Sequence, residues 1–154
     1  MKDKQQVELF KASEVKLHYV GKQKPREREK ISNPEEASEL FFRIWDMDTI
    51  EHIEEVKIML LNRSNHVLGF ATISKGGLTG CIMDIRLIMQ YVIKSNACAV
   101  ILAHNHPSGS LIASEADIHI TKKIREALNF LDITLLDHLI MNVDKEYVSV
   151  MDMI

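Results

Sequence analysis

The segment 97–117 constrains the fold of this 154-residue chain more than any other part of the sequence. An apolar run leads directly into His104 and His106, and a Pro-Ser-Gly turn follows. Ser114 then precedes a long helical pattern, as is typical of a helix N-cap. This order predicts a buried strand, a tight loop and a helix start, so polar residues from the strand end and the helix start should lie close together.

His104 and His106 stand two residues apart, so in an extended segment their side chains point to the same side. Asp117 falls in the first turn of the predicted helix, where it faces back toward the loop. Two histidines and one aspartate leave a fourth tetrahedral position for water, which is typical of a catalytic zinc site. We therefore predict that these three residues bind Zn²⁺, which lowers the pKa of bound water to about 7.

Each of these features has a simpler explanation when it is taken alone. A single histidine on an apolar strand is usually a core or surface residue, and Ser114 with Asp117 could be only a capping box. The combined spacing is more specific: His-x-His, seven residues, Ser, two residues, Asp. The whole pattern therefore indicates a functional site more strongly than any one of its parts does.

This spacing resembles the JAMM signature of MPN-type metalloproteases, and the run His-Asn-His-Pro-Ser-Gly is similar to the RadC family, whose members have been labelled DNA repair proteins. The stretches 60–65, 97–106 and 135–140 resemble successive strands of that family, and the resemblance covers about residues 33–150. It implies an α/β fold, a three-layer α-β-α sandwich around a mixed β-sheet, MPN/JAMM-like and cytidine-deaminase-like.

The resemblance also implies a glutamate that activates the water. Glu54 and Glu55 precede the apolar run 56–61, and Glu54 matches the position of the RadC glutamate. Neighbouring strand residues face opposite sides, so only one of the two can point at the metal. We favour Glu54 as the catalytic base; a shift of one residue would give the role to Glu55, and a solvated acidic pair is the simpler alternative.

Ser114 is expected to have two compatible roles. As an N-cap it stabilises the helix by about 1 kcal/mol. The resemblance implies that its hydroxyl also helps to hold the oxyanion of a tetrahedral intermediate. Asp137 and His138 lie on a later predicted strand, where a buried polar pair needs hydrogen bonds. For this pair we favour support of a neighbouring helix or loop over a role in catalysis.

Residues 1–32 are expected to form an N-terminal extension or edge-strand arm, with an alternating stretch at 15–20, and residues 33–154 to form the MPN/JAMM-like RadC domain. An apolar content of 46% suits one compact domain of this length. The patterns predict helices over 33–45, 84–95 and 114–131 and strands over 56–61, 67–73, 97–103, 133–141 and 147–150.

The two cysteines, Cys81 and Cys98, form no Cys-x-x-Cys pair, so reduced thiols are expected; Cys98 is expected within an apolar strand, where a free cysteine behaves as a small hydrophobe. The N-terminus has no apolar signal region, and no apolar run is long enough to span a bilayer. The sequence therefore predicts a cytoplasmic protein that does not associate with membranes.

These observations together predict a zinc-dependent hydrolase, a metallopeptidase or isopeptidase that acts on a peptide or protein substrate. The alternative is a DNA-repair-associated module of the RadC type, which binds DNA or a DNA-repair partner without peptidase turnover. A net charge of -3 gives no overall electrostatic support for nucleic-acid binding. The segment 22–30 mixes five basic residues with two glutamates, which favours a solvated linker over a phosphate-binding patch.

Overall fold

A computed structural model describes residues 19–76 and 81–154 of the chain. Its centre is a five-stranded sheet of order β2-β1-β3-β4-β5. β3 and β4 are parallel, whereas the other neighbouring pairs are antiparallel. The strands are β1 (Glu55–Leu61), β2 (Val67–Lys75), β3 (Ala99–Asn105), β4 (Thr134–Met141) and β5 (Tyr147–Ser149).

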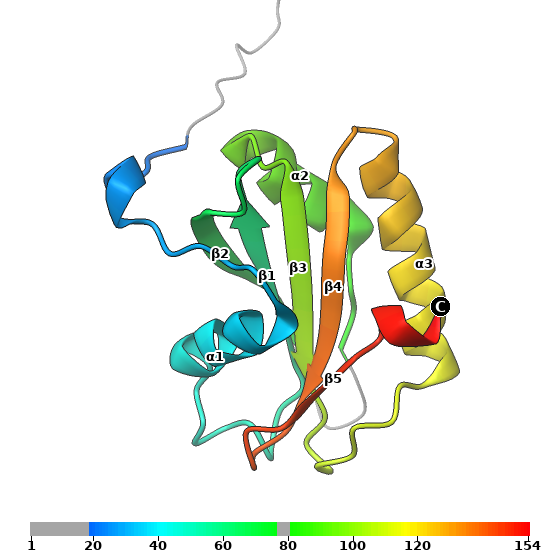
Figure 1. The fold of residues 1–154 in the computed structure, drawn as a ribbon. Coiled ribbons are helices and arrows are strands. Elements are labelled where there is room, and N and C mark those ends of the chain that lie inside the picture. The colour runs from blue at the N-terminus through cyan, green and yellow to red at the C-terminus, as the bar shows by residue number, and fades with distance from the viewer. Residues whose placement is uncertain (1–18, 77–80) are drawn as a thin grey trace, which may run out of the picture.

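Three helices cover the two faces of this sheet: α1 (Pro34–Ile44), α2 (Ile85–Ser95) and α3 (Glu115–Asn129). α1 packs on one face, and α2 and α3 pack on the other (Figure 1). Short 3₁₀ turns lie at Pro25–Glu27 and Met151–Met153. The expected three-layer α-β-α sandwich around a mixed sheet is confirmed. Within the described ranges, no helix combines the length and the apolar character that crossing a bilayer requires.

The side-chain alternation of the central strands divides the apolar core in two. Val56 and Ile58 of β1 and Leu102 of β3 are buried toward α2 and α3. Met59 of β1 and Ile101 of β3 are buried toward α1. A strand with both faces covered is apolar on both sides, which explains the continuous apolar runs of β1 and β3.

β3 begins and ends two residues later than the apolar run predicted, because its pairing with β4 continues to Asn105 opposite Met141. His104 therefore lies inside a paired strand and shares the α2/α3 face with Leu102. The predicted helix starts are confirmed: Asn33 accepts a hydrogen bond from the backbone N–H of Glu36, and the N-cap of α3 is Ser114.

The prediction for Cys98 was wrong. This residue is exposed and lies in a bend before β3. Its backbone is paired on both sides, because its N–H donates to the carbonyl of Leu61 and its own carbonyl accepts from Thr134. Cys98 thus lies just before β3 with an exposed side chain, and an apolar run alone does not show where the strand begins. Cys81 and Cys98 are both free thiols.

The N-terminal arm is described from residue 19, so most of the predicted strand at 15–20 lies outside the described residues. Beyond the 3₁₀ turn, Lys30 forms an isolated antiparallel bridge with His66, and Glu29 accepts a hydrogen bond from the N–H of Val67. Residues just before the predicted domain boundary at 32/33 thus contact the start of β2.

Candidate metal centre

His104 is held at the centre of the sheet. It is fully buried, and its neighbours across the strands are Val56 of β1 and Ile140 of β4. Because both flanking strands fix the backbone here, the imidazole has a set direction toward the α3 side of the sheet. A ligand on such a central strand is positioned more rigidly than one on a loop.

His106 follows directly after β3, where its N–H still donates to the carbonyl of Met141. The chain then turns at Gly109, whose φ of 79° suits a residue without Cβ. The turn brings the Ser110 carbonyl oxygen to 2.8 Å from His106 Nδ1. A carbonyl only accepts hydrogen bonds, so Nδ1 carries the proton and the lone pair of neutral His106 is on Nε2.

Asp117 is in the first turn of α3, where it forms a capping box with Ser114. Asp117 Oδ2 accepts from the Ser114 backbone N–H at 2.8 Å and lies 2.6 Å from Ser114 Oγ, while the Asp117 N–H donates to that Oγ at 3.1 Å. These bonds fix the carboxylate with its Oδ1 3.3 Å from His104 Nε2. The capping box and the site therefore use the same side chains.

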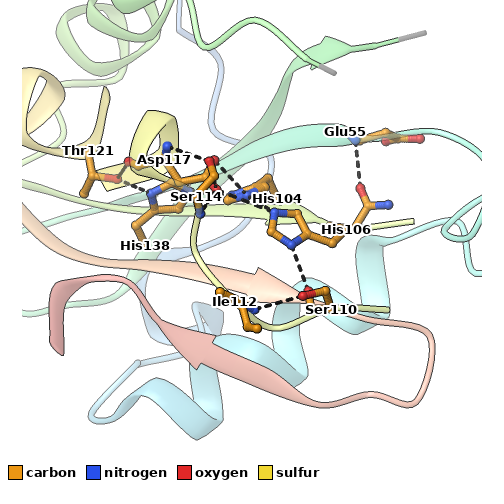
Figure 2. Close-up of polar contacts among 10 residues, drawn as sticks. Glu55, His104, His106, Ser110, Ile112, Ser114, Asp117, Thr121 and His138 are labelled. Carbon is orange, nitrogen blue, oxygen red and sulfur yellow. Dashed lines mark hydrogen bonds and ion pairs between the residues drawn. The ribbon is translucent and has the colours of Figure 1, made fainter. Parts of the chain in front are cut away.

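The candidate ligand atoms of His104, His106 and Asp117 all lie within 4.8 Å of one another (Figure 2). The two Nε2 atoms are 3.0 Å apart, and the nearest carboxylate oxygens are 3.3 and 3.7 Å from them. Zinc bonds of about 2.0–2.2 Å at tetrahedral angles separate ligand atoms by about 3.4 Å. The observed spacings bracket that value, so the donor set fits a tetrahedral metal ion.

The charges at this site also suit a cation. Burial disfavours the ionised carboxylate of Asp117, but its contacts with the imidazoles of His104 and His106 and its hydrogen bonds with Ser114 outweigh this effect and hold the pKa of Asp117 well below its usual range. The pKa of His106 is raised, chiefly by the Asp117 carboxylate, whose Oδ2 lies 3.7 Å from His106 Nε2. The site thus holds an ionised carboxylate beside two imidazoles and attracts positive charge.

The two candidate glutamates have different surroundings. Glu54 is half-buried just before β1, and its charge adds a smaller contribution to the raised pKa of His106. Glu55 is almost fully buried, and its carboxylate lies 2.6 Å from Lys57 Nζ and 3.0 Å from Lys75 Nζ. Lys57 also lies over the ring of Trp45, which belongs to the α1 side of the sheet. Glu55 is therefore engaged by lysines away from the imidazoles.

Comparison with known proteins agrees with this architecture. The family model for the RadC-like JAB domain matches residues 31–153. The chain belongs to the RadC family. Its relatives are called UPF0758 proteins: one from Flavobacterium johnsoniae is 48% identical over 94 residues, which cover 61% of this chain and 41% of the relative. One from Porphyromonas gingivalis is 41% identical over 99 residues, covering 64% and 44%.

A third UPF0758 protein, from Clostridium beijerinckii, is 35% identical over 116 residues, or 75% of this chain and 49% of the relative. The matched regions thus span less than half the length of these curated relatives. Family membership, together with the His-His-Asp group, indicates a JAB-type domain with a potential metal site.

Sequence reasoning missed the role of Asn105 in this RadC domain. Its side chain points away from the two histidines beside it and is fully buried. Oδ1 accepts from the N–H of Glu55 at 2.7 Å, and Nδ2 donates to the carbonyls of Ile50 and Ile53 at 2.7 and 2.9 Å. Asn105 therefore ties the metal-site strand to the segment that carries Glu54. The only sign in the sequence is its place between the two histidines.

His138 was also underestimated. It is fully buried on β4, and its Nε2 lies 2.8 Å from His104 Nδ1. Burial and the neighbouring His104 hold the pKa of His138 well below the usual histidine value, so it is neutral. Asp137, the other member of the pair, accepts hydrogen bonds from Ser149 Oγ and from the N–H of His138. The pair was expected only to support a helix or loop, yet His138 contacts a candidate metal ligand directly.

Proposed function

We propose that this RadC domain is a zinc-dependent hydrolase, a metallopeptidase or isopeptidase that cleaves an amide bond in a peptide or protein. One observation carries the proposal: Nε2 of His104, Nε2 of His106 and the Asp117 carboxylate converge at spacings that suit tetrahedral zinc. Three protein ligands leave one coordination position for water or substrate, which distinguishes catalytic zinc sites from closed structural ones.

Bound zinc supplies a Lewis acid that lowers the pKa of water to about 7 and polarises a carbonyl. Glu54 acts as the general base that accepts a proton from the attacking water, and it then returns this proton to the leaving amine. The surroundings of the two carboxylates support Glu54 over Glu55. The charge of Glu54 contributes to the raised pKa of His106. The carboxylate of Glu55 is instead paired with Lys57 and Lys75. A carboxylate already paired with two ammonium groups is a poor proton acceptor.

Ser114 donates a hydrogen bond to the developing oxyanion. Its Oγ accepts from the Asp117 N–H, and its hydroxyl hydrogen has Asp117 Oδ2 within reach at 2.6 Å. Rotation about the Cβ–Oγ bond redirects that hydrogen without moving the oxygen. The helix cap can therefore remain intact while the hydroxyl turns toward substrate.

The first test is the zinc content of purified protein, with wild type compared with His104→Ala and Asp117→Ala. The exposed His119 on α3 provides a matched control as His119→Ala. We expect about one zinc per chain in wild type and in the control, as one three-ligand site requires, and loss of zinc in the other two variants. Absence of zinc from folded wild type after metal is supplied would refute the proposal.

The second test separates the base from the metal. Glu54→Gln should retain zinc but lose peptidase turnover, because a neutral amide cannot accept the proton. Glu51→Gln, at a nearby exposed position, serves as the control and should keep full turnover. Full activity of zinc-loaded Glu54→Gln would exclude Glu54 as the base.

The nucleic-acid alternative has less support. The chain has a net charge of -3, and Glu29 in the basic segment forms a two-bond ion pair with Arg43 of α1. We expect a flat titration with duplex DNA even at low salt. Binding with a steep salt dependence would instead indicate a phosphate-contacting surface.

A further inference from the structure

A chain of buried hydrogen bonds extends behind His104, on the side of the ring away from the candidate metal position. His104 Nδ1 lies 2.8 Å from His138 Nε2, and His138 Nδ1 lies 2.6 Å from Thr121 Oγ1 (Figure 2). Thr121 Oγ1 in turn lies 2.5 Å from the backbone carbonyl oxygen of Asp117. His104, His138 and Thr121 are each 0% exposed. Three secondary-structure elements, β3, β4 and α3, each contribute one of these side chains.

The chemistry of the groups assigns a direction to every bond. The Asp117 carbonyl only accepts, so Thr121 gives it the single hydroxyl hydrogen. Thr121 Oγ1 must then accept from His138, which places the His138 proton on Nδ1. Neutral His138 has a lone pair on Nε2, and the His104 Nδ1–H donates to it. His104 is left with its own lone pair on Nε2, the atom nearest to His106 and Asp117.

We propose that His138 and Thr121 are positioning residues that lock His104 in the Nδ1–H tautomer and aim its Nε2 at the metal. This inference rests on the proposed zinc centre, but it concerns residues that are not themselves metal ligands. Metal-binding histidines usually donate their second ring N–H to a fixed acceptor, and loss of that acceptor weakens metal binding by about 10–100-fold.

The chain also links two of the three ligands. It starts at the His104 ring and ends at the backbone of Asp117, whose carboxylate faces back to His104 Nε2. The hydrogen bonds thus tie the ring of one candidate ligand to the backbone of the other through His138 and Thr121, while the two atoms that would face the metal make no hydrogen bond to each other. A neutral imidazole acceptor adds no negative charge behind the ligand, unlike the carboxylate that often fills this position.

The test measures zinc affinity by competition with a chromophoric chelator. His138→Phe and Thr121→Val remove the acceptor and the hydroxyl while keeping similar volume, and we expect each to bind zinc about 10–100-fold more weakly than wild type. Thr121→Ser restores a hydroxyl and should return most of the affinity. Ser149→Ala removes a buried hydrogen bond to Asp137 elsewhere on β4 and β5, so it controls for a general loss of stability.

Long-range ¹H–¹⁵N NMR of histidine-labelled wild type tests the same inference without relying on a variant that must fold. We expect the zinc-loaded spectrum to show His104 protonated at Nδ1 and coordinated through Nε2. Coordination through Nδ1 would overturn the inference, as would His138→Phe and Thr121→Val variants that bind zinc as tightly as Ser149→Ala; in both cases the zinc centre would stand. A wild type that binds no zinc would overturn the inference and the proposed function together.

Discussion

Replacement of Asn105 by alanine should destabilise this domain far more than a typical asparagine substitution. Asn105 is fully buried and makes three hydrogen bonds, with the N–H of Glu55 and the carbonyls of Ile50 and Ile53. Each such bond contributes about 1 kcal/mol net, so three give about 3 kcal/mol. Because the truncation also leaves buried backbone groups without a hydrogen-bond partner, we expect Asn105→Ala to lower the unfolding free energy by at least about 3 kcal/mol.

The measurement is urea unfolding at neutral pH with a chelator present, so that bound metal does not add to the stability. Asn33→Ala is the matched control, because Asn33 makes one hydrogen bond at the exposed N-cap of α1 and its loss should cost about 1 kcal/mol. The slope of the unfolding free energy against urea concentration should be the same as in wild type if both variants unfold in one step. If Asn105→Ala lowers the unfolding free energy no more than Asn33→Ala does, the role of Asn105 in tying β3 to the segment before β1 is refuted.

Three further predictions concern polar groups around the sheet and the start of α3. Burial would raise the pKa of Glu55, but its two lysine partners outweigh burial and lower the pKa below 4.5. The extra stability of wild type over Glu55→Gln should therefore be complete above pH 4.5 and should shrink as the pH falls further. Urea unfolding at a series of pH values measures this difference. Burial raises the pKa of Asp137 above 3.8, so Asp137→Asn should be at least as stable as wild type at pH 7, and a marked fall in its melting temperature would contradict this. Ser114→Ala should lower the unfolding free energy by about 1 kcal/mol, because the Asp117 N–H loses its acceptor; an unchanged value would show that the cap is not needed.

Local patterns predicted much of the structure because they report local geometry. The His-x-His spacing fixes a common side of an extended chain, and Ser114 with Asp117 fixes a helix start. The structure accordingly brings the three candidate ligands within 4.8 Å of one another. The two helices and the strands around this segment also lie within about two residues of their predicted bounds, as expected where apolar periodicity is strong.

The strand register shows which face of β1 meets the histidines, and the sequence alone could not tell Glu54 from Glu55 in this respect. The order of residues shows only that adjacent positions face opposite ways. The pairing of Val56 with His104 then establishes which face of β1 meets the histidines. The exposed Cys98 is a related case, because the apolar run did not show that β3 begins only at Ala99, one residue later.

By itself, the sequence determined the ligand types, their spacing and the strand-loop-helix order that joins them, since all three depend on contacts within a few residues. Only the tertiary structure decided what stands behind those ligands. His138 is 34 positions from His104, and Asn105 is 50 positions from its partner Glu55. Such pairs meet only because β1, β3 and β4 lie side by side in one particular order and register. Burial of both faces of the sheet determines this order and register, and no local pattern in the sequence does.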